Sequence, residues 1–241
     1  MYIPRWRASD LLLQPLEKNQ YRSKLYGLMS LKDIASGAGF KVLGFLVCKD
    51  PRGFSIRAFR NPSEGRLIVR TDIDRWGQTH SMEEWASMPR LNLYLRGKNP
   101  AKSERTVREW MAKVFRSRQE ALFIVHKVRD LRDYERSVQL NVDIPAGRVI
   151  ISSTTAGTDK FRDEKVESAE LQTDDKGRIR RVLGEPTVLP EQLQQKTISM
   201  LRSMIGFAER TGHGVFEASY VTYKEAPDNP EFYDLIFGKK M

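Results

Sequence analysis

The spacing of apolar residues predicts three long helices along the chain. They are expected over residues 20–38, 103–120 and 190–210, where apolar side chains recur three or four positions apart. Ser103 is the expected N-terminal cap of the second helix. The third begins at Pro190 and is followed by Gly212, which is the usual asymmetry of helix ends.

Continuous apolar runs and alternating patterns predict a larger number of strands. The expected strands are residues 41–48, 54–59, 65–71, 91–95, 122–128, 137–142, 148–153, 215–221 and 231–237. Turn residues at 145–147, 174–177 and 226–230 predict hairpins, the second of them within residues 159–181. The lack of polar–apolar alternation in residues 122–128 indicates a central strand.

These elements together predict an α+β fold of two α+β lobes with mainly antiparallel sheets. We expect an N-terminal lobe over residues 1–97 and a C-terminal lobe over residues 98–241. The boundary is expected at the Gly-Lys-Asn-Pro sequence that precedes the second long helix.

Composition narrows the class of protein. The chain has 241 residues, of which 40% are hydrophobic and 30% are charged, as in an ordinary globular protein. No apolar run approaches the roughly 20 residues that span a bilayer. The single cysteine, Cys48, excludes an internal disulfide framework and is expected to be a buried apolar side chain. We therefore expect a cytoplasmic protein without a membrane segment.

The charge balance suggests an anionic partner. The formal net charge is +10, from 41 Lys and Arg against 31 Asp and Glu. Nucleotides and nucleic acids both fit such an excess, and Trp6, Phe59 and Trp76 each stand beside an arginine. An alternative is that the basic residues are ordinary solvated positions, because they are spread along the whole chain.

Two acidic residues near the C-terminus form a candidate metal site. Glu217 and Asp234 belong to the last two expected strands. If these strands pair as a hairpin, both carboxylates can reach one face of the sheet, because side chains alternate with period two. Mg²⁺ prefers oxygen ligands together with nucleotide phosphates. The alternative is that both acids simply face solvent on an amphipathic hairpin.

The order of elements between residues 20 and 237, ending in two acid-bearing strands, resembles the ATP-grasp superfamily. It is most similar to the nucleotide-binding domains of phosphoenolpyruvate synthase and pyruvate phosphate dikinase. The resemblance implies that ATP is the cofactor and that Glu217 and Asp234 hold its Mg²⁺. It also implies that Arg70, on an early strand, contacts the phosphates as a catalytic residue.

The same resemblance assigns roles to two further segments. The strand that contains His126 and Lys127 corresponds to the hinge that meets the adenine, with Lys127 as a second phosphate-binding catalytic residue. The loop that contains Gly77 and Thr79 corresponds to the flexible loop that covers the phosphates.

The resemblance implies ATP- and Mg²⁺-dependent phosphoryl transfer or carboxylate ligation, with a small carboxylate as substrate. Two positions depart from the family pattern. The usual Glu-x-Asn of the last strand is replaced by Asp234-Leu235-Ile236, so one metal ligand is missing, and Arg70 replaces a lysine. A degenerate, binding-only member is therefore one alternative. A basic nucleic-acid-binding protein without catalysis is the other.

Other chemistries lack their sequence signatures. The chain has no Gly-x-x-x-x-Gly-Lys-Ser/Thr loop, no dinucleotide-binding Gly-x-Gly-x-x-Gly and no Gly-x-Ser-x-Gly nucleophile turn. One cysteine and three widely spaced histidines make a zinc site unfavourable.

Overall fold

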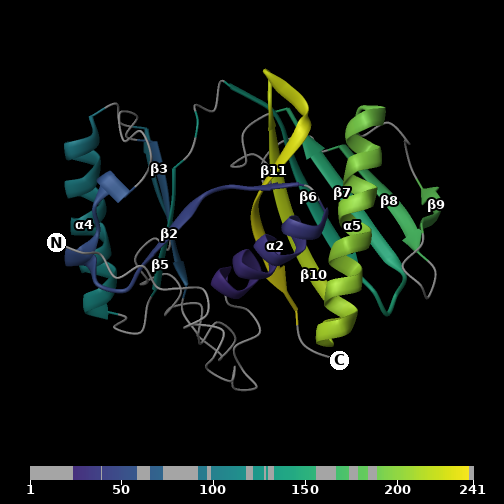
Figure 1. Cartoon of the computed structure of the whole chain (residues 1–241), viewed down its shortest axis with the longest axis horizontal. Helices are drawn as coiled ribbons and strands as arrows, with labels where there is room; N and C mark the ends of the chain where they lie inside the picture. The colour runs from purple at the N-terminus through teal and green to yellow at the C-terminus, as the bar shows by residue number, and fades with distance from the viewer. Residues whose placement is uncertain are drawn as a thin grey trace. The chain divides into compact units, whose positions relative to one another are not determined.

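The computed structural model describes residues 24–38, 40–58, 66–72, 92–96, 99–117, 122–127, 129, 133–155, 167–173, 179–183 and 189–238 (Figure 1). The chain divides into two compact units that are interleaved along the sequence. Unit 1 comprises Met1–Leu25 and Gly44–Asp130, and unit 2 comprises Tyr26–Leu43 and Leu131–Met241. The chain thus passes between the units three times, whereas we expected one boundary after residue 97.

Unit 1 is built on a four-stranded antiparallel sheet. Its strands are β2 (Phe45–Cys48), β5 (Leu122–Lys127), β3 (Arg66–Asp72) and β4 (Asn92–Arg96), in that spatial order. β5 pairs with both β2 and β3, so the segment predicted to be a central strand occupies that place. One helix, α4 (Pro100–Ser117), packs against this sheet.

Alternation along the strands gives the sheet of unit 1 one apolar face for α4. The core between helix and sheet consists of fully or nearly fully buried side chains from both elements: Leu67, Val69, Phe123, Val125, Val107, Met111 and Val114. Helix α4 begins at Pro100, and the side chain of Asn99 accepts a hydrogen bond from the backbone N–H of Lys102 at 3.0 Å. Asn99 is therefore the cap, and the expectation that Ser103 fills this role was wrong.

Unit 2 is built on a larger sheet of seven strands. Their spatial order is β1 (Lys41–Val42), β11 (Ala226–Phe237), β10 (Val215–Tyr223), β6 (Tyr134–Asp143), β7 (Arg148–Thr154), β8 (Glu167–Thr173) and β9 (Ile179–Leu183). Only the short β1 pairs in parallel, with β11. The strands of the three predicted hairpins pair as β6–β7, β8–β9 and β10–β11.

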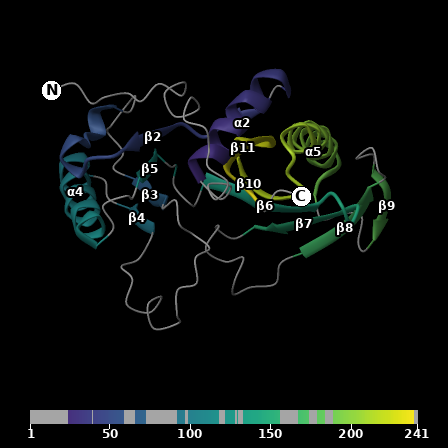
Figure 2. The same ribbon diagram turned by 90° about the horizontal axis from the view of Figure 1, so that it is seen from below.

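Two helices lie on the same side of the seven-stranded sheet, as Figure 2 shows. They are α2 (Lys24–Ala38) and α5 (Glu191–Thr211). α5 is anchored by a buried hydrogen bond of 2.7 Å between the hydroxyls of Thr197 and Tyr220 on β10. α2 crosses β11 so closely that a Cβ atom at Gly27 would collide with the carbonyl of Leu235. Only glycine fits this crossing.

Three local predictions were wrong. Residues 41–48 are not one strand, because β1 joins one sheet and β2 the other, with a break at Leu43 and Gly44. Residues 51–58 form two short 3₁₀ turns, Pro51–Gly53 and Ile56–Ala58. The predicted turn at 226–230 is part of β11, and the chain turns at residues 224–225 instead.

The predicted class is confirmed: the protein is α+β, with mainly antiparallel sheets. Among the described residues, no helix is long and apolar enough to cross a membrane.

Candidate functional site

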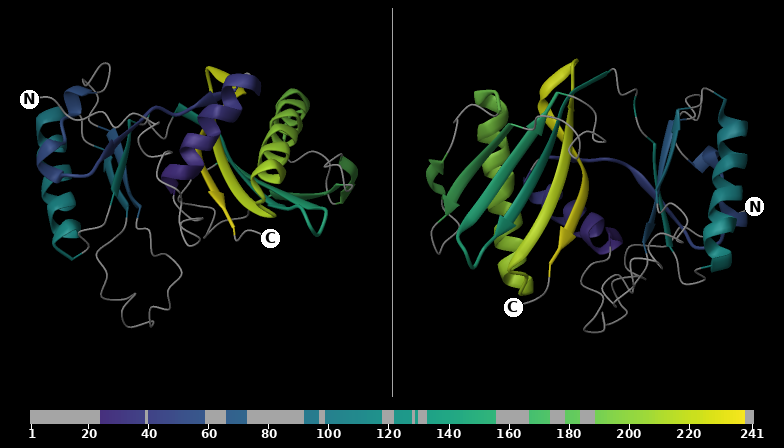
Figure 3. Two further views of the ribbon diagram at one scale, coloured as in Figure 1. Left: turned by 60° about the horizontal axis from the view of Figure 1, so that its bottom comes forward. Right: turned by 180° about the vertical axis from the view of Figure 1, so that it is seen from behind.

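In the described part of the chain, the seven-stranded sheet has one face buried under helices and one face without them. On β10, Phe216, Ala218 and Tyr220 are buried on the side of α2 and α5. Glu217 and Ser219 alternate with them and therefore belong to the opposite face. Figure 3, on the right, looks onto the strands with both helices behind them. We call this helix-free side of the sheet in unit 2 the open face.

The pairing of β10 with β11 puts the two candidate metal-binding acids on the open face. Glu217 pairs with Ile236, and Ser219 pairs with Asp234. Directly paired residues share a face, so Glu217 and Asp234 are diagonal neighbours on one side of the hairpin. Diagonal neighbours in an antiparallel pair lie roughly 7–8 Å apart, within the span of a metal ion bridging two carboxylates.

Strand β6 adds polar residues that the sequence interpretation did not include in the site. Asn141 pairs with Glu217, and Gln139 pairs with Ser219, so both belong to the open face. Ser152 of β7 pairs with Gln139 and extends the same row. The alternation of polar and apolar residues in Ser-Val-Gln-Leu-Asn-Val-Asp indicates that the polar residues of β6 share one face. It does not indicate how β6 pairs with β10.

The burial of these groups differs in a way that suits ion binding. The relative solvent exposure is only 8% for Asp234 and 6% for Ser219, whereas Glu217 and Asn141 are half-buried. A third acid of the open face, Glu231, is engaged elsewhere because its carboxylate accepts a 2.7 Å hydrogen bond from the Tyr223 hydroxyl. Two carboxylates with amide and hydroxyl oxygens beside them form a donor set that suits a hard cation.

This donor set is too small for a metal site made of protein ligands alone. Within the described ranges, no group of three or more His, Cys, Asp or Glu side chains could hold a metal ion. Mg²⁺ is commonly held by one or two carboxylates, with water and phosphate oxygens completing its octahedron. The residues present therefore fit Mg²⁺ bound together with a phosphorylated ligand.

In unit 1, the face of the sheet away from α4 carries Arg70 and His126. His126 pairs with Phe45 on one side and with Ile68 on the other, and Arg70 pairs with Ile124. The ring of Phe45 lies 5.9 Å from that of His126. Arg70 is half-buried.

His126 is a neutral, buried histidine. Its side chain is 1% exposed, and within the described structure neither ring nitrogen reaches a hydrogen-bond partner. Burial, reinforced by the positive charge of Arg70, lowers the pKa of His126 to about 3, although the backbone of Gly44 opposes the shift. An imidazole held neutral by burial is poorly suited to acid–base chemistry near neutral pH.

Two other potentially reactive side chains, those of Cys48 and His213, are buried in the core. Cys48 is buried, and burial together with the charge of Asp50 raises the pKa of its thiol to about 11. The thiol is therefore a poor nucleophile, as its expected role as an apolar core residue requires. His213 is fully buried and stacks on Phe237 with ring centroids 4.3 Å apart.

The structure describes only part of the predicted site. Glu217 and Asp234 belong to unit 2, whereas Arg70 and His126 belong to unit 1. Lys127 is the last residue of β5 and pairs with Leu67, and its side chain lies outside the described part. Gly77 and Thr79 lie outside the described residues altogether.

Comparison with known proteins gives a likeness in structure but not in sequence. No protein-family profile matches the sequence, and neither does any curated protein. The chain is similar to the dinucleotide-forming acetyl-coenzyme A synthetase 1 of Ca. Korarchaeum cryptofilum, with 13% identity, a TM-score of 0.55 and coverage of 97% of this chain and 100% of that one. It is also similar to PH1788 of Pyrococcus horikoshii Ot3, with 11% identity, a TM-score of 0.53 and coverage of 97% of each chain.

A larger enzyme matches more weakly. The ADP complex of PurK, an N5-carboxyaminoimidazole ribonucleotide synthetase, has 14% identity and a TM-score of 0.46, and this chain spans only 45% of its length. The α+β architecture of the present chain is therefore shared with solved proteins of nearly the same length. At these identities the likeness concerns the fold alone.

Proposed function

We propose that the protein binds ATP with Mg²⁺ at the open face and uses it as ATP-grasp enzymes do, in phosphoryl transfer or carboxylate ligation. The observation that carries this proposal is the register of β10 and β11, in which Glu217 and Asp234 are diagonal neighbours on the helix-free side of the sheet. A solvated amphipathic hairpin would not require Asp234 to be 92% shielded from water beside Ser219.

In this proposal, Glu217 and Asp234 hold the metal, and Asn141 supplies the oxygen that the last strand lacks. Asn141 pairs with Glu217 from β6, on the side of β10 opposite to β11, so its amide can add an oxygen ligand beside Glu217. Bound Mg²⁺ would neutralise phosphate charge and orient the transferred group. The protein residues then bind and position the nucleotide and exclude water.

Arg70 and Lys127 are the proposed cations for the phosphates. The planar guanidinium of Arg70 can bind two phosphate oxygens with a rigid fork of N–H donors, whereas a lysine offers a flexible point charge. Gly77 and Thr79 belong to the proposed covering loop. His126, being neutral, would contribute to an apolar wall near the adenine.

The nature of the substrate is proposed from the family resemblance and from one neighbour. The Korarchaeum enzyme was solved with coenzyme A and Ca-AMPCP, so a protein of similar fold accommodates an adenine nucleotide and a thiol carrier. A small carboxylate activated as an acyl phosphate is the substrate class that fits such chemistry. A member that binds ATP without turnover is the second form of the same proposal.

Calorimetric titration of ATP with and without Mg²⁺ tests the site. In the Glu217→Ala/Asp234→Ala variant, we expect Mg²⁺-dependent affinity to fall at least tenfold, because each contact to a charged group contributes about 1.5–3 kcal/mol. The matched control is Glu225→Ala/Asp228→Ala, which removes two acids from the other end of the same hairpin. This control should bind as the wild type does.

The Asn141→Ala variant sharpens the assignment. It should weaken binding in the presence of Mg²⁺ and leave metal-free binding unchanged. Equal affinity in the wild type and in the Glu217→Ala/Asp234→Ala variant would overturn the metal site. Absence of ATP binding by the wild type would overturn the proposed function as a whole.

A further inference from the structure

The excess positive charge of the protein resides in one of its two units. The sequence of unit 1 contains 23 Lys and Arg against 12 Asp and Glu, whereas unit 2 contains 18 against 19. The net charge of +10 therefore comes entirely from unit 1. Strong charge asymmetry between parts of a chain points to an anionic macromolecule as partner.

Within unit 1, the outer side of α4 carries a straight stripe of cations. Lys102, Arg105, Lys113 and Arg116 are all exposed, and at 3.6 residues per turn they fall within one sector of the helix, which also contains the exposed acid Glu109. The buried residues Val107, Met111 and Val114 occupy the opposite sector, against the sheet. Fourteen residues at 1.5 Å each give the stripe a length of about 21 Å.

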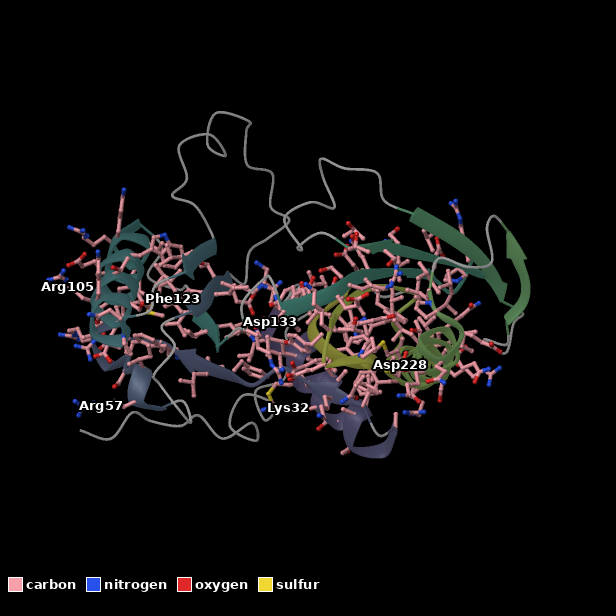
Figure 4. All side chains as sticks on the ribbon, turned by 90° about the horizontal axis from the view of Figure 1, so that it is seen from above. Lys32, Arg57, Arg105, Phe123, Asp133 and Asp228 are labelled. Carbon is pink, nitrogen blue, oxygen red and sulfur yellow. The ribbon has the colours of Figure 1, made fainter. Side chains whose placement is uncertain are left out.

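Most of these cations are not needed to hold the fold together. In the described parts of the chain, Lys102, Lys113 and Arg116 form no ion pair, and Arg105 approaches Glu109 only at 4.0 Å. Arg108 shows the contrast, because it pairs with Glu104 at 2.8 Å and donates to the Phe54 carbonyl at 2.7 Å. Figure 4 shows the nitrogen-tipped side chains of α4, Arg105 among them, pointing away from the sheet.

We infer that the outer side of α4 is a docking surface for double-stranded DNA, bound through its phosphates. A rigid row of cations about 21 Å long matches a duplex, which presents roughly one negative charge per 1.7 Å of its axis. The surface has no exposed aromatic residue for base stacking, since Val215 in unit 2 is the one exposed large hydrophobic side chain among the described residues. Binding by charge without stacking disfavours single strands, which rely on aromatic platforms.

The absence of an apolar centre on this surface also argues against a protein partner. Stable protein interfaces have a buried core enriched in aromatic residues and depleted in charge. The exposed positions of α4 are instead charged or small: Ala101, Lys102, Arg105, Arg108, Glu109, Lys113 and Arg116. The expected recognition is of the backbone of the duplex, without preference for base sequence.

Fluorescence anisotropy with a labelled DNA duplex of about two helical turns tests this surface. With four phosphate contacts, log Kd should change with log salt by a slope of about 3.6, so affinity falls about 100-fold between about 50 and about 200 mM salt. The Lys102→Gln/Arg105→Gln/Lys113→Gln/Arg116→Gln variant should abolish most of this slope. A matched control, Lys41→Gln/Arg202→Gln/Arg210→Gln/Lys224→Gln, removes four exposed cations from unit 2 and should retain at least half of it.

Each comparison in the experiment either supports or overturns the inference. An unchanged slope in the α4 variant, or an equal loss in the unit 2 control, would overturn it. Tighter binding of single-stranded DNA, of duplex RNA or of a heparin oligosaccharide of equal charge would overturn the assignment to duplex DNA. ATP titration of the α4 variant should match the wild type, so this inference and the proposed nucleotide site can fail separately.

Discussion

In both units, alternation along the strands puts apolar side chains on one face of the sheet and other side chains on the opposite face. The two units differ in the charge of the side chains on that opposite face. Each sheet buries an apolar face under helices, α4 in unit 1 and α2 with α5 in unit 2. On their other faces, unit 1 carries Arg70 and a neutral His126, while unit 2 carries Glu217, Asp234 and neutral polar side chains. The two sheets thus differ in the side chains that they carry on the face away from the described helices, basic and neutral in unit 1 but acidic and neutral in unit 2.

Of the features compared here, the close packing of α2 on the sheet of unit 2 should lose the most stability on a single substitution. In Gly27→Ala, the new methyl group meets the Leu235 carbonyl, so α2 must move off the sheet. We expect a loss of about 3 kcal/mol in the free energy of unfolding, at the upper end for overpacking. Chemical denaturation measures it, and Gly37→Ala in the same helix, where a Cβ meets nothing within 4 Å, should be neutral or stabilising. Equal effects of the two changes would contradict the close crossing.

The buried histidine of unit 1 should make the stability of the protein sensitive to acid. The folded state keeps His126 neutral down to its pKa of about 3, whereas the unfolded chain protonates it near 6.5. The unfolded state thus binds more protons in this window, and stability falls by up to about 1.4 kcal/mol per pH unit as pH drops below 6.5.

Denaturation of the wild type and of His126→Phe between pH 7 and pH 4 measures this contribution. The variant should show a shallower loss of stability with falling pH. A His126→Gln variant keeps a polar group at the position and should be equally shallow. If both variants keep the slope of the wild type, the acid sensitivity arises elsewhere.

A smaller effect is expected where the first turn of α2 meets β3. The backbone N–H of Leu25 donates to the Asp72 carboxylate at 2.9 Å, and the Lys24 ammonium donates to the Thr71 carbonyl at 3.2 Å. Asp72→Ala removes the acceptor and should cost about 1 kcal/mol, as the loss of a helix cap usually does. Asp50→Ala, which removes an exposed cap of a short 3₁₀ turn, is the control and should cost less.

Local sequence signals predicted much of the secondary structure. The α5 helix lies between Pro190 and Gly212 as expected, and Gly212 adopts a left-handed conformation with φ of 74°. The turn at 145–147 joins β6 and β7. These features depend on neighbours within a few residues, so the sequence alone contains them.

Features decided by distant partners could not be predicted. Residues 41–48 form one apolar run, and nothing within it reveals that β1 pairs with β11 while β2 pairs with β5. Pro227 and Pro230 argued for a turn, yet they lie in a part of β11 where the pairing register is interrupted, and proline is tolerated there.

The candidate site likewise contains positions that local sequence patterns predict and one position that depends on a distant strand. The positions of Glu217 and Asp234 on one face follow from alternation and a hairpin, both of which are local. The proximity of Asn141 depends on the pairing of β6 with β10 across more than seventy residues of sequence, and no local pattern fixes that register.

The interleaved path of the chain also limits how the protein can be cut into fragments. β5 lies after residue 97 in the sequence but is the strand bonded to both β2 and β3. A fragment that ends at residue 97 would therefore lack the middle strand of its own sheet, and it would also lack α4. The remaining fragment would lack α2 and leave apolar positions of β11 open to water. Neither piece should fold alone, although the two should reassemble when they are expressed together.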